Sequence, residues 1–490
     1  MLTLLSLLAL SPGLTGCTGA SDAPPAPAPA AAPLPDKVLI IIDTLRADAM
    51  HYAGNPLETT PNLDALAADA AWFSRAYSAG TWTLPGTASI FTGMLPSKHR
   101  VVHDADDRDL FGQLSDDIPT VASALKTKGY RTAAFINNAF MAPAFGLNQG
   151  FDTYDYEGAG LQDHRTAQQT VDAALAWLSQ SDAPSFLVVH VMEPHADYQI
   201  AAPFAGRFTA DLPHTPELTL PLGGDLVDQM IQRRHIPGDD DKAWIHAAYH
   251  EEVLATDAAI GALLDGLQGR PGWAASTVVV TSDHGEEFWE HGAYEHGHSC
   301  NSVVTGVPLI VKAPGVKPHR NDSVVSLVEL YPLLTAEAGD VHRLATAGVT
   351  ERGRFAVSED TLYSDPQASA VTDDLRLITD LTSDQFWFHT LDADGVESAT
   401  PSQDVGLVPS AKRLRRLLCE ARGDLTPTRA LDSIAVPNPD VFQALIDLGY
   451  VDAPDVDAPD DPPEPDAPPP RDEARDEAPA TPTGDPCAAY

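Results

Sequence analysis

This sequence has few basic side chains. Its 490 residues include 30 Lys and Arg against 70 Asp and Glu, which gives a formal net charge of −40. A surface of that sign repels phosphate backbones, and this argues against nucleic acid as a partner. Cysteine is also scarce. Apart from Cys17 the chain has only Cys300, Cys419 and Cys487. They lack the close spacing of a metal motif, so at most one pair of these three could form a disulfide.

Long apolar runs of the kind that cross membranes are missing as well, except near the beginning of the chain. The segment MLTLLSLLALSPGLTGCTGA is too short to span a bilayer as a permanent helix, and small residues precede Cys17. Its LTGC resembles the lipobox of bacterial lipoproteins. That resemblance implies a signal peptide over residues 1–17, a lipid on Cys17 and an extracytoplasmic location in a bacterial cell envelope. An ordinary cleaved signal is the alternative.

Two further stretches have too few apolar side chains to build a core. Residues 18–36 are rich in Pro and Ala, and we expect them to form a tether ahead of the folded body. Residues 451–490 are acidic and rich in Pro, which predicts a disordered tail. A solvated spacer is one interpretation of this tail, and a binding segment is the other.

Between these ends, strand patterns alternate with helix patterns. Continuous apolar, β-branched runs predict strands buried on both faces at residues 37–43, 185–191 and 276–282. Helical periodicity predicts helices at residues 59–74, 120–129, 166–180 and 251–267. The alternation predicts an α/β fold with a doubly wound sheet.

Ionisable residues lie at or just after the end of each of the three predicted strands. Asp43 ends the first strand, Glu193 and His195 follow the second, and Asp283 and His284 follow the third. Open α/β sheets bind ligands at the carboxyl ends of their strands, so we expect these side chains to converge.

The densest group of chemically active side chains is TSDHGEEFWEHGAYEHGHS, residues 281–299. It holds four histidines and five carboxylates directly after a predicted strand. Imidazole nitrogens together with carboxylate oxygens suit Zn²⁺ or Mn²⁺, whereas sites made of oxygen alone suit Ca²⁺ or Mg²⁺. A divalent metal site is therefore expected here, with Zn or Mn favoured and Ca as the alternative.

Six motifs occur in a fixed order along the body: VLIIIDTLRAD, TTPNLDALAADAAWFSRAYS, TWTLPGTASIFTGMLPSKHRV, GYRTAAF, HVMEPHADY and VVVTSDHGEEFWEHG. In this order they resemble the sulfatase family of the alkaline phosphatase superfamily, over roughly residues 37–400. The resemblance implies a central mixed sheet flanked by helices, in a catalytic domain over residues 37–345. It also implies a small C-terminal α+β subdomain over residues 346–450, and one or two divalent metals.

The resemblance also implies roles for particular residues. Asp43 matches an acidic metal ligand at the end of the first strand, while Thr44 stands where sulfatases usually have a second Asp. Asp283 and His284 match the metal-binding pair after the later strand. His195 in MEPHADY matches the active-site histidine of the family.

The nucleophile departs from the sulfatase pattern. That signature is Cys or Ser, then x-P-x-R, whereas this chain reads Thr83-Leu84-Pro85-Gly86-Thr87. Threonine cannot be converted to formylglycine, and both the signature Arg and the Lys expected after GYRT are missing. Similar threonines serve nucleotide phosphodiesterases and phospho-alcohol transferases. The hypothesis is that a metal held by Asp43, Asp283 and His284 would keep the Thr83 oxygen as an alkoxide that attacks phosphorus. His195 would protonate the leaving group. A helix N-cap is the plain alternative for Thr83.

Other assignments stay open among the remaining polar residues. His298 is favoured over His291 and His296 as a further metal ligand. Arg46, Lys98 and His291 are candidates for substrate contacts, and solvation on a helix surface is the alternative for Arg46 and Lys98. The sequence thus predicts a hydrolase of a phosphate, phosphodiester or sulfate ester on a small molecule, lipid or glycan. A phospho-alcohol transferase and a non-catalytic envelope binding protein are the alternatives.

Overall fold

The structure is a computed structural model that describes residues 34–104, 110–156, 165–336, 354–383, 385–392 and 395–430, together with Cys487. The predicted lipidation site Cys17 lies outside the described residues, as do nearly all of the predicted tether and of the acidic tail.

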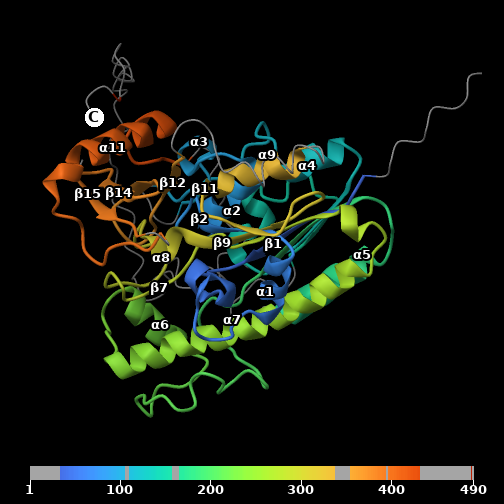
Figure 1. Cartoon of the computed structure of the whole chain (residues 1–490), viewed down its shortest axis with the longest axis horizontal. Coiled ribbons are helices and arrows are strands. Elements are labelled where there is room, and N and C mark those ends of the chain that lie inside the picture. Colours follow the sequence, from blue (N-terminus) through green and yellow to red (C-terminus); the bar gives the residue numbers. More distant parts are fainter. Residues whose placement is uncertain are drawn as a thin grey trace, which may run out of the picture. The chain divides into compact units, whose positions relative to one another are not determined.

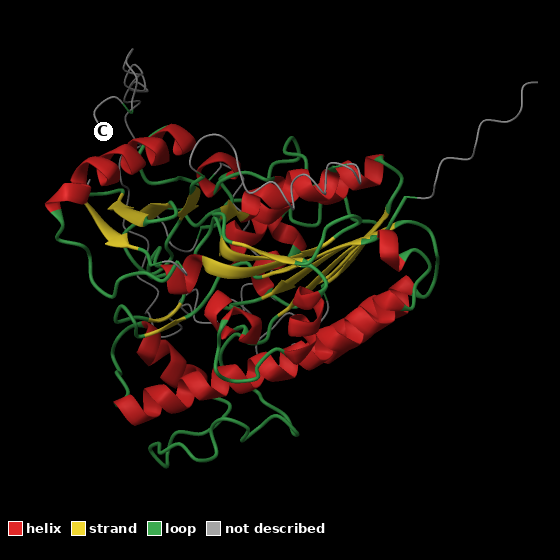
Figure 2. Ribbon diagram, viewed as in Figure 1, coloured by secondary structure: helices red, strands yellow, loops and turns green. Residues whose placement is uncertain are grey.

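A mixed sheet lies at the centre of the described body (Figures 1 and 2). Its strand order is β10-β2-β9-β6-β1-β5-β3-β4, and β11 also pairs with β2. Strands β5 and β6 flank β1 and run parallel to it, whereas β9 is antiparallel to β6 and β2. The strands are β1 Lys37–Ile42, β2 Ala71–Tyr77, β3 Arg131–Phe135, β4 Thr153–Asp155, β5 Ser185–Val191, β6 Thr277–Thr281, β9 Gly306–Lys312, β10 His319–Asn321 and β11 Val325–Ser326.

Helices cover both faces of this sheet, as Figure 1 shows. The first face carries α1 Pro61–Ala68, α5 Ala167–Leu178 and α7 Asp239–Gln268, and the second carries α2 Thr83–Thr92, α4 Val121–Thr127 and α9 Leu330–Thr335. Side chains of β1 alternate between the two cores: Ile40 packs with the first face and Ile41 with the second. Burial on both faces explains why β1 is a continuous apolar run. The short helices are α3 Pro96–His99, α6 Gly224–Ile231 and α8 Ser302–Thr305.

A second, antiparallel sheet follows along the chain, with strand order β12-β13-β14-β15. Its strands are β12 Ala356–Glu359, β13 Gln367–Val371, β14 Leu375–Asp380 and β15 Phe386–Thr390, and α11 Val408–Arg422 packs on β13 and β14. A disulfide joins Cys419 of α11 to Cys487, whereas Cys300 is a buried free thiol. The chain therefore has an α/β body with a mixed central sheet flanked by helices, and a smaller C-terminal sheet with one described helix.

Two of the predicted helices are wrong in extent. The helix expected over residues 59–74 ends at Ala68, because Ala71–Tyr77 pairs with β9 as strand β2. The helix expected over residues 251–267 begins earlier, at Asp239, with three aspartates in its first turn, where acidic groups favour a helix.

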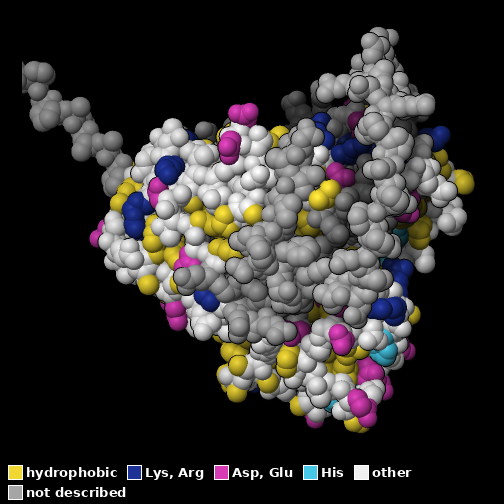
Figure 3. All heavy atoms as spheres, turned by 180° about the vertical axis from the view of Figure 1, so that it is seen from behind, with side chains coloured by type: hydrophobic (Ala, Val, Ile, Leu, Met, Phe, Trp, Pro, Cys, Tyr) yellow, Lys and Arg dark blue, Asp and Glu magenta, His cyan; other side chains and the backbone are white. Residues whose placement is uncertain are grey.

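No helix in the described part of the chain is long and apolar enough to cross a membrane. On the face shown in Figure 3, acidic and basic side chains are interspersed with apolar ones.

Candidate active site

Three neighbouring parallel strands bring ionisable side chains to one edge of the central sheet. Asp43 directly follows β1, His190 lies near the end of β5, and Asp283 and His284 follow β6. Thr83 comes from the first residue of α2. All five side chains are buried, with exposures of 0 to 1%. Of the side chains predicted to converge at the strand ends, Asp43, Asp283 and His284 do so, whereas Glu193 Oε1 accepts from the backbone nitrogen of Ala167.

Asp43, His190 and Asp283 form a group that could hold a metal ion. One ligand atom of each lies within 4.8 Å of the others. His284 Nε2 is close to the same two carboxylates, at 3.4 Å from Asp43 Oδ1 and 3.5 Å from Asp283 Oδ2. Asp43 Oδ1, Asp283 Oδ2 and both ring nitrogens of His190 are buried without a hydrogen-bond partner. Buried groups of this kind are costly unless something satisfies them, and two carboxylates with imidazoles are a donor set that suits Zn²⁺ or Mn²⁺.

The electrostatics of this group also favour a cation. Burial and the nearby negative charge of Asp283 raise the pKa of Asp43 well above its ordinary value. Burial would raise the pKa of Asp283 too, but the neighbouring imidazoles of His284 and His190 outweigh that effect, and its pKa lies below the usual range. Two buried carboxylates that share one site cannot both ionise cheaply without a positive partner. A divalent cation would supply that charge.

The nucleophile candidate points at this group. Thr83 Oγ1 lies 3.3 Å from His284 Nε2. His284 Nδ1 lies 3.0 Å from the carbonyl oxygen of Gly285, which places the ring proton on Nδ1 and leaves Nε2 as the ligand or acceptor nitrogen. Asn138 joins the two sides: its Nδ2 donates to Asp43 Oδ2 at 2.6 Å and lies 3.4 Å from Thr83 Oγ1.

Close backbone packing places Thr83 at this position. A Cβ added to Gly86 would lie 2.7 Å from the carbonyl oxygen of Asp283, and one added to Gly80 would lie 2.5 Å from the nitrogen of Gly86. The glycines therefore let the first turn of α2 pack directly against the end of β6. The N-cap of α2 is Trp82, and Thr83 is the first helical residue. The N-cap interpretation of Thr83 is therefore wrong.

Three imidazoles form a row that leads away from the carboxylates. The ring of His296 lies 4.3 Å from that of His284 and 5.1 Å from that of His195. His195 Nδ1 lies 2.7 Å from the carbonyl oxygen of Ala196, so Nε2 is the nitrogen that would exchange a proton. His195 is 6% exposed, so it is a buried histidine and not a surface one. His296 Nδ1 lies 3.1 Å from Glu286 Oε1, and burial raises the pKa of Glu286.

The remaining site candidates lie in other surroundings. His298 is buried against Tyr363, with ring centroids 5.0 Å apart, and its Nε2 has no hydrogen-bond partner. Burial and then the charge of Arg233 lower the pKa of His298 to about 4. No contact joins His298 to the carboxylates among the described residues, and its role as a metal ligand stays a prediction.

The three substrate-contact candidates have protein partners. Arg46 forms ion pairs of 2.6 Å with Asp48 and with Glu290. Lys98 donates to the carbonyl of Arg422 at the end of α11. His291 Nε2 lies 3.5 Å from Glu397 Oε1. We call Asp43, Thr83, Asn138, His190, Asp283 and His284 the cluster. Among the described residues, no contact joins Arg46, Lys98 or His291 to the cluster, and Arg46 is buried and not solvated on a helix surface.

Two residues of the cluster, His190 and Asn138, were not predicted from the sequence. His190 sits inside an apolar strand run and looks like a core histidine, although it is one residue from the end of β5. Asn138 follows β3 in FINN, at a strand end of the same sheet edge. In both cases the position beside a strand end was the available signal.

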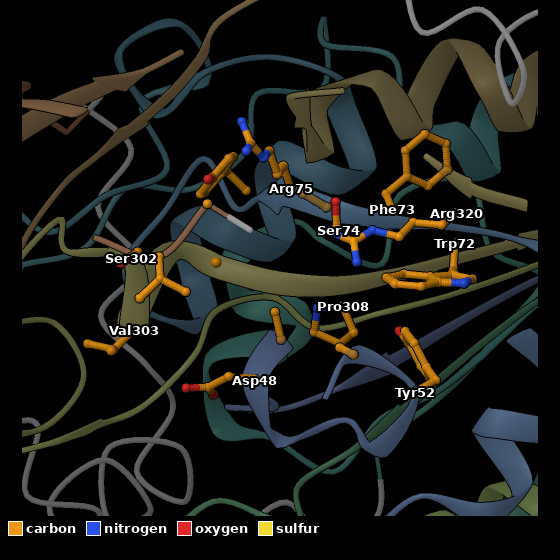
Figure 4. Close-up of a pocket in the computed structure, with 17 residues that line it drawn as sticks. Asp48, Tyr52, Trp72, Phe73, Ser74, Arg75, Ser302, Val303, Pro308 and Arg320 are labelled. Carbon is orange, nitrogen blue, oxygen red and sulfur yellow. The ribbon is translucent and has the colours of Figure 1, made fainter. Parts of the chain in front are cut away.

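A separate pocket of about 190 Å³ lies between β2 and β9 on one side and residues 47–53 on the other (Figure 4). Trp72, Tyr52 and Arg320 form its aromatic and basic end. None of the cluster residues lines this pocket. The pocket is therefore separate from the cluster, which is the candidate active site.

The site can now be compared with known proteins. Residues 35–339 match the family model described as Sulfatase. The chain is 25% identical over 420 residues to the uncharacterized sulfatase YidJ of Escherichia coli (strain K12), which covers 72% of this chain and 80% of that protein. It is 25% identical over 356 residues to the choline-sulfatase of Rhizobium meliloti (strain 1021), covering 62% and 68%.

Solved structures agree on the fold. The phosphonate monoester hydrolase of Agrobacterium radiobacter superposes with a TM-score of 0.63 at 17% identity, covering 79% of this chain and 95% of that one. The family match spans most of the chain and includes every element that carries the cluster. The chain belongs to the sulfatase family, a family of ester hydrolases.

Proposed function

We propose that this protein is a divalent-metal-dependent hydrolase that cleaves a phosphate, phosphodiester or sulfate ester with Thr83 as its nucleophile. The observation that carries the proposal is the position of Thr83 Oγ1, 3.3 Å from His284 Nε2, which itself lies 3.4 Å from Asp43 Oδ1 in a buried group suited to a metal. Asp43, His190, Asp283 and His284 would hold the ion. When bound, a divalent cation lowers the pKa of an adjacent hydroxyl and offsets negative charge on the ester group.

Each residue then has a chemical task. Thr83, once its hydroxyl proton has left to solvent, attacks the phosphorus or sulfur atom and displaces the alcohol, which gives an ester on its own oxygen. Water later cleaves this ester and returns a proton to the threonine oxygen. Asn138 donates to Asp43 and lies within reach of the attacking oxygen, so it fixes their relative position. His195 gives a proton to the departing alkoxide, because an imidazole exchanges protons near neutral pH.

Phosphorus esters rank above sulfate esters in this proposal. The chain has Thr83 and Thr87 where the sulfatase signature has a convertible residue and an arginine. The structural similarity to a phosphonate monoester hydrolase agrees with that ranking. The chain is also similar to a choline-sulfatase, so a sulfate ester is included among the substrates to be tested.

Hydrolysis of matched p-nitrophenyl esters tests the proposal. The panel contains the sulfate, the phosphate, a phosphodiester and a phosphonate monoester, each with Zn²⁺, Mn²⁺ or Ca²⁺, and Thr83→Ala and Thr83→Ser are the variants. We expect metal-dependent turnover of a phosphorus ester, its loss in Thr83→Ala and partial retention in Thr83→Ser. Turnover that is indifferent to Thr83 would contradict the assigned nucleophile. Absence of both turnover and bound metal would favour a binding protein.

We also propose that the enzyme works outside the cytoplasm, anchored by a lipid on Cys17. The LTGC sequence supports this, and so does the Cys419–Cys487 disulfide, because disulfides persist in oxidising compartments. We expect the wild type to incorporate a labelled fatty acid and to associate with membranes. We expect Cys17→Ser to lose both properties. Equal membrane association of both proteins would contradict the anchor.

A further inference from the structure

A segment of the C-terminal sheet runs alongside the turn that carries the nucleophile. Residues 358–363 comprise the end of β12 and the first part of its connection to β13. The hydroxyl of Ser358 donates to the carbonyl of Ser78 at 2.6 Å, and the backbone nitrogen of Glu359 donates to the carbonyl of Ala79 at 2.9 Å. The second sheet is thus bonded to the chain just ahead of α2.

Asp360 contacts the two residues that precede Thr83. Its carbonyl oxygen accepts from Thr81 Oγ1 at 2.6 Å, and its carboxylate Oδ2 accepts from the indole Nε1 of Trp82 at 3.0 Å. Oδ1 lies 3.4 Å from His103 Nδ1. Asp360 is 7% exposed and has a φ of 75°, a conformation that Asp tolerates better than most residues.

The same segment also contacts the loop that carries His298. The backbone nitrogens of Leu362 and Tyr363 donate to the carbonyl of Gly297 at 2.7 and 3.0 Å. Gly297 in turn donates its backbone nitrogen to the carbonyl of Thr81 at 3.0 Å. Residues 358–363 therefore join the nucleophile turn to the histidine loop.

We propose that Asp360 is a positioning residue. Through its contacts with Thr81 and Trp82, the C-terminal sheet holds Thr83 with its hydroxyl facing the cluster. This inference rests on the proposed function of Thr83 as nucleophile. Trp82 is the N-cap of α2, so a bond that fixes its indole and another that fixes Thr81 determine where the first residue of the helix lies. Small displacements of reacting groups are costly: a shift of about 1 Å can lower a rate by about 100-fold.

Two measurements on Asp360→Ala and Trp82→Phe test the proposal. The first is kcat and KM on whichever p-nitrophenyl ester the wild type hydrolyses. The second is amide hydrogen exchange of the peptide that spans residues 79–84, which needs no turnover. Asp365→Ala is the matched control, because Asp365 is an exposed carboxylate in the same β12–β13 connection. Asp360→Asn keeps an acceptor oxygen and serves as the conservative variant.

We expect Asp360→Ala to lower kcat by at least about tenfold with KM within about threefold of the wild type, and to increase exchange in the 79–84 peptide. Trp82→Phe should lower kcat in the same direction, and the double variant should lose less than the product of the two. Asp360→Asn should recover most of kcat. Asp365→Ala should match the wild type in both measurements.

Other outcomes of these measurements would overturn the proposal. An unchanged kcat with unchanged exchange overturns the proposal, as does a lower melting temperature without any loss of kcat. Fully multiplicative losses in the double variant would also overturn it. If the wild type hydrolyses none of the esters, the proposed function fails by itself, and exchange in the 79–84 peptide alone then decides whether Asp360 holds the turn.

Discussion

The hydroxyl oxygen of Thr83 lies 3.3 Å from Nε2 of His284, although 201 residues separate them in the sequence. That nitrogen is also within 3.5 Å of Asp43 and Asp283. One ring nitrogen therefore faces the nucleophile candidate and both carboxylates, so one ion at this point could contact all of them.

His190 should be required for metal binding. Both of its ring nitrogens are buried without a hydrogen-bond partner beside two carboxylates. We expect His190→Ala to weaken Zn²⁺ or Mn²⁺ binding by at least about tenfold, since even outer partners of metal ligands contribute 10- to 100-fold. Metal content after dialysis and the metal-induced rise in melting temperature measure this. His319→Ala, on edge strand β10, is the control. Equal metal content in both variants would remove His190 from the site.

Asn138 should contribute to turnover more than to stability. Its amide is oriented because Oδ1 accepts from the backbone nitrogen of Phe140 at 2.8 Å, which aims Nδ2 at Asp43 and Thr83. We expect Asn138→Ala to lower kcat by about 10- to 100-fold, a little less than the loss of a full oxyanion donor. The matched control is Asn137→Ala, since the Asn137 amide donates to the carbonyl of Arg165. Similar kcat values for the two variants would contradict the assignment.

Acid should destabilise the fold partly through His99. This side chain is fully buried, accepts from the backbone nitrogen of Val101 at 3.0 Å and lies 3.0 Å from Ser89 Oγ of α2. Burial lowers its pKa from 6.5 to about 3. The folded state therefore holds His99 neutral, and the stability linked to it is complete above pH 6.5 and declines as pH falls toward 3.

The expected slope from His99 is at most about 1.4 kcal/mol per pH unit between those values. Urea unfolding at several pH values, compared between the wild type and His99→Asn, measures the difference. The variant should have a lower stability at pH 7 and a weaker dependence on pH. Parallel curves for the two proteins would mean that His99 does not carry this dependence.

The Cys419–Cys487 disulfide should stabilise the C-terminal sheet. It closes a long loop, with a sequence separation of 68 residues. In the chain-entropy model such a loop corresponds to about 4 kcal/mol. We expect the double variant Cys419→Ser with Cys487→Ser to melt at a lower temperature, and a reductant to lower the melting temperature of the wild type but not of that variant. A reductant effect of equal size on both proteins would point to a different cause.

Much of the site could be predicted because it lies at strand ends. Asp43, Asp283 and His284 follow apolar strand runs, and parallel strands bring their carboxyl ends to one edge regardless of the details of packing. Thr83 was identified through the motif around it; its Oγ1 lies 3.3 Å from His284 Nε2, and its role as nucleophile stays a prediction.

The contacts that could not be predicted depend on packing between segments that are far apart in the sequence. Lys98 was a candidate substrate contact, but its ammonium reaches the end of α11, 324 residues further along the chain. Asp360 directly follows strand β12 of the second sheet, and no pattern near it indicates that its carboxylate would contact the indole of Trp82. Contacts between distant segments depend on how the two sheets pack, and local periodicity does not contain that information. The strand β2 was misread as helix for a related reason, since AWFSRAY becomes a strand through pairing with β9.

The most direct test of the central claim is to identify the residue that becomes esterified during turnover. Wild-type enzyme, loaded with metal and mixed with a p-nitrophenyl ester, is quenched within the first turnover and digested, and its peptides are examined by mass spectrometry. The account predicts a phosphoryl, phosphonyl or sulfuryl group on Thr83, with none in Thr83→Ala. A modification at another residue, or undiminished turnover in Thr83→Ala, would contradict it.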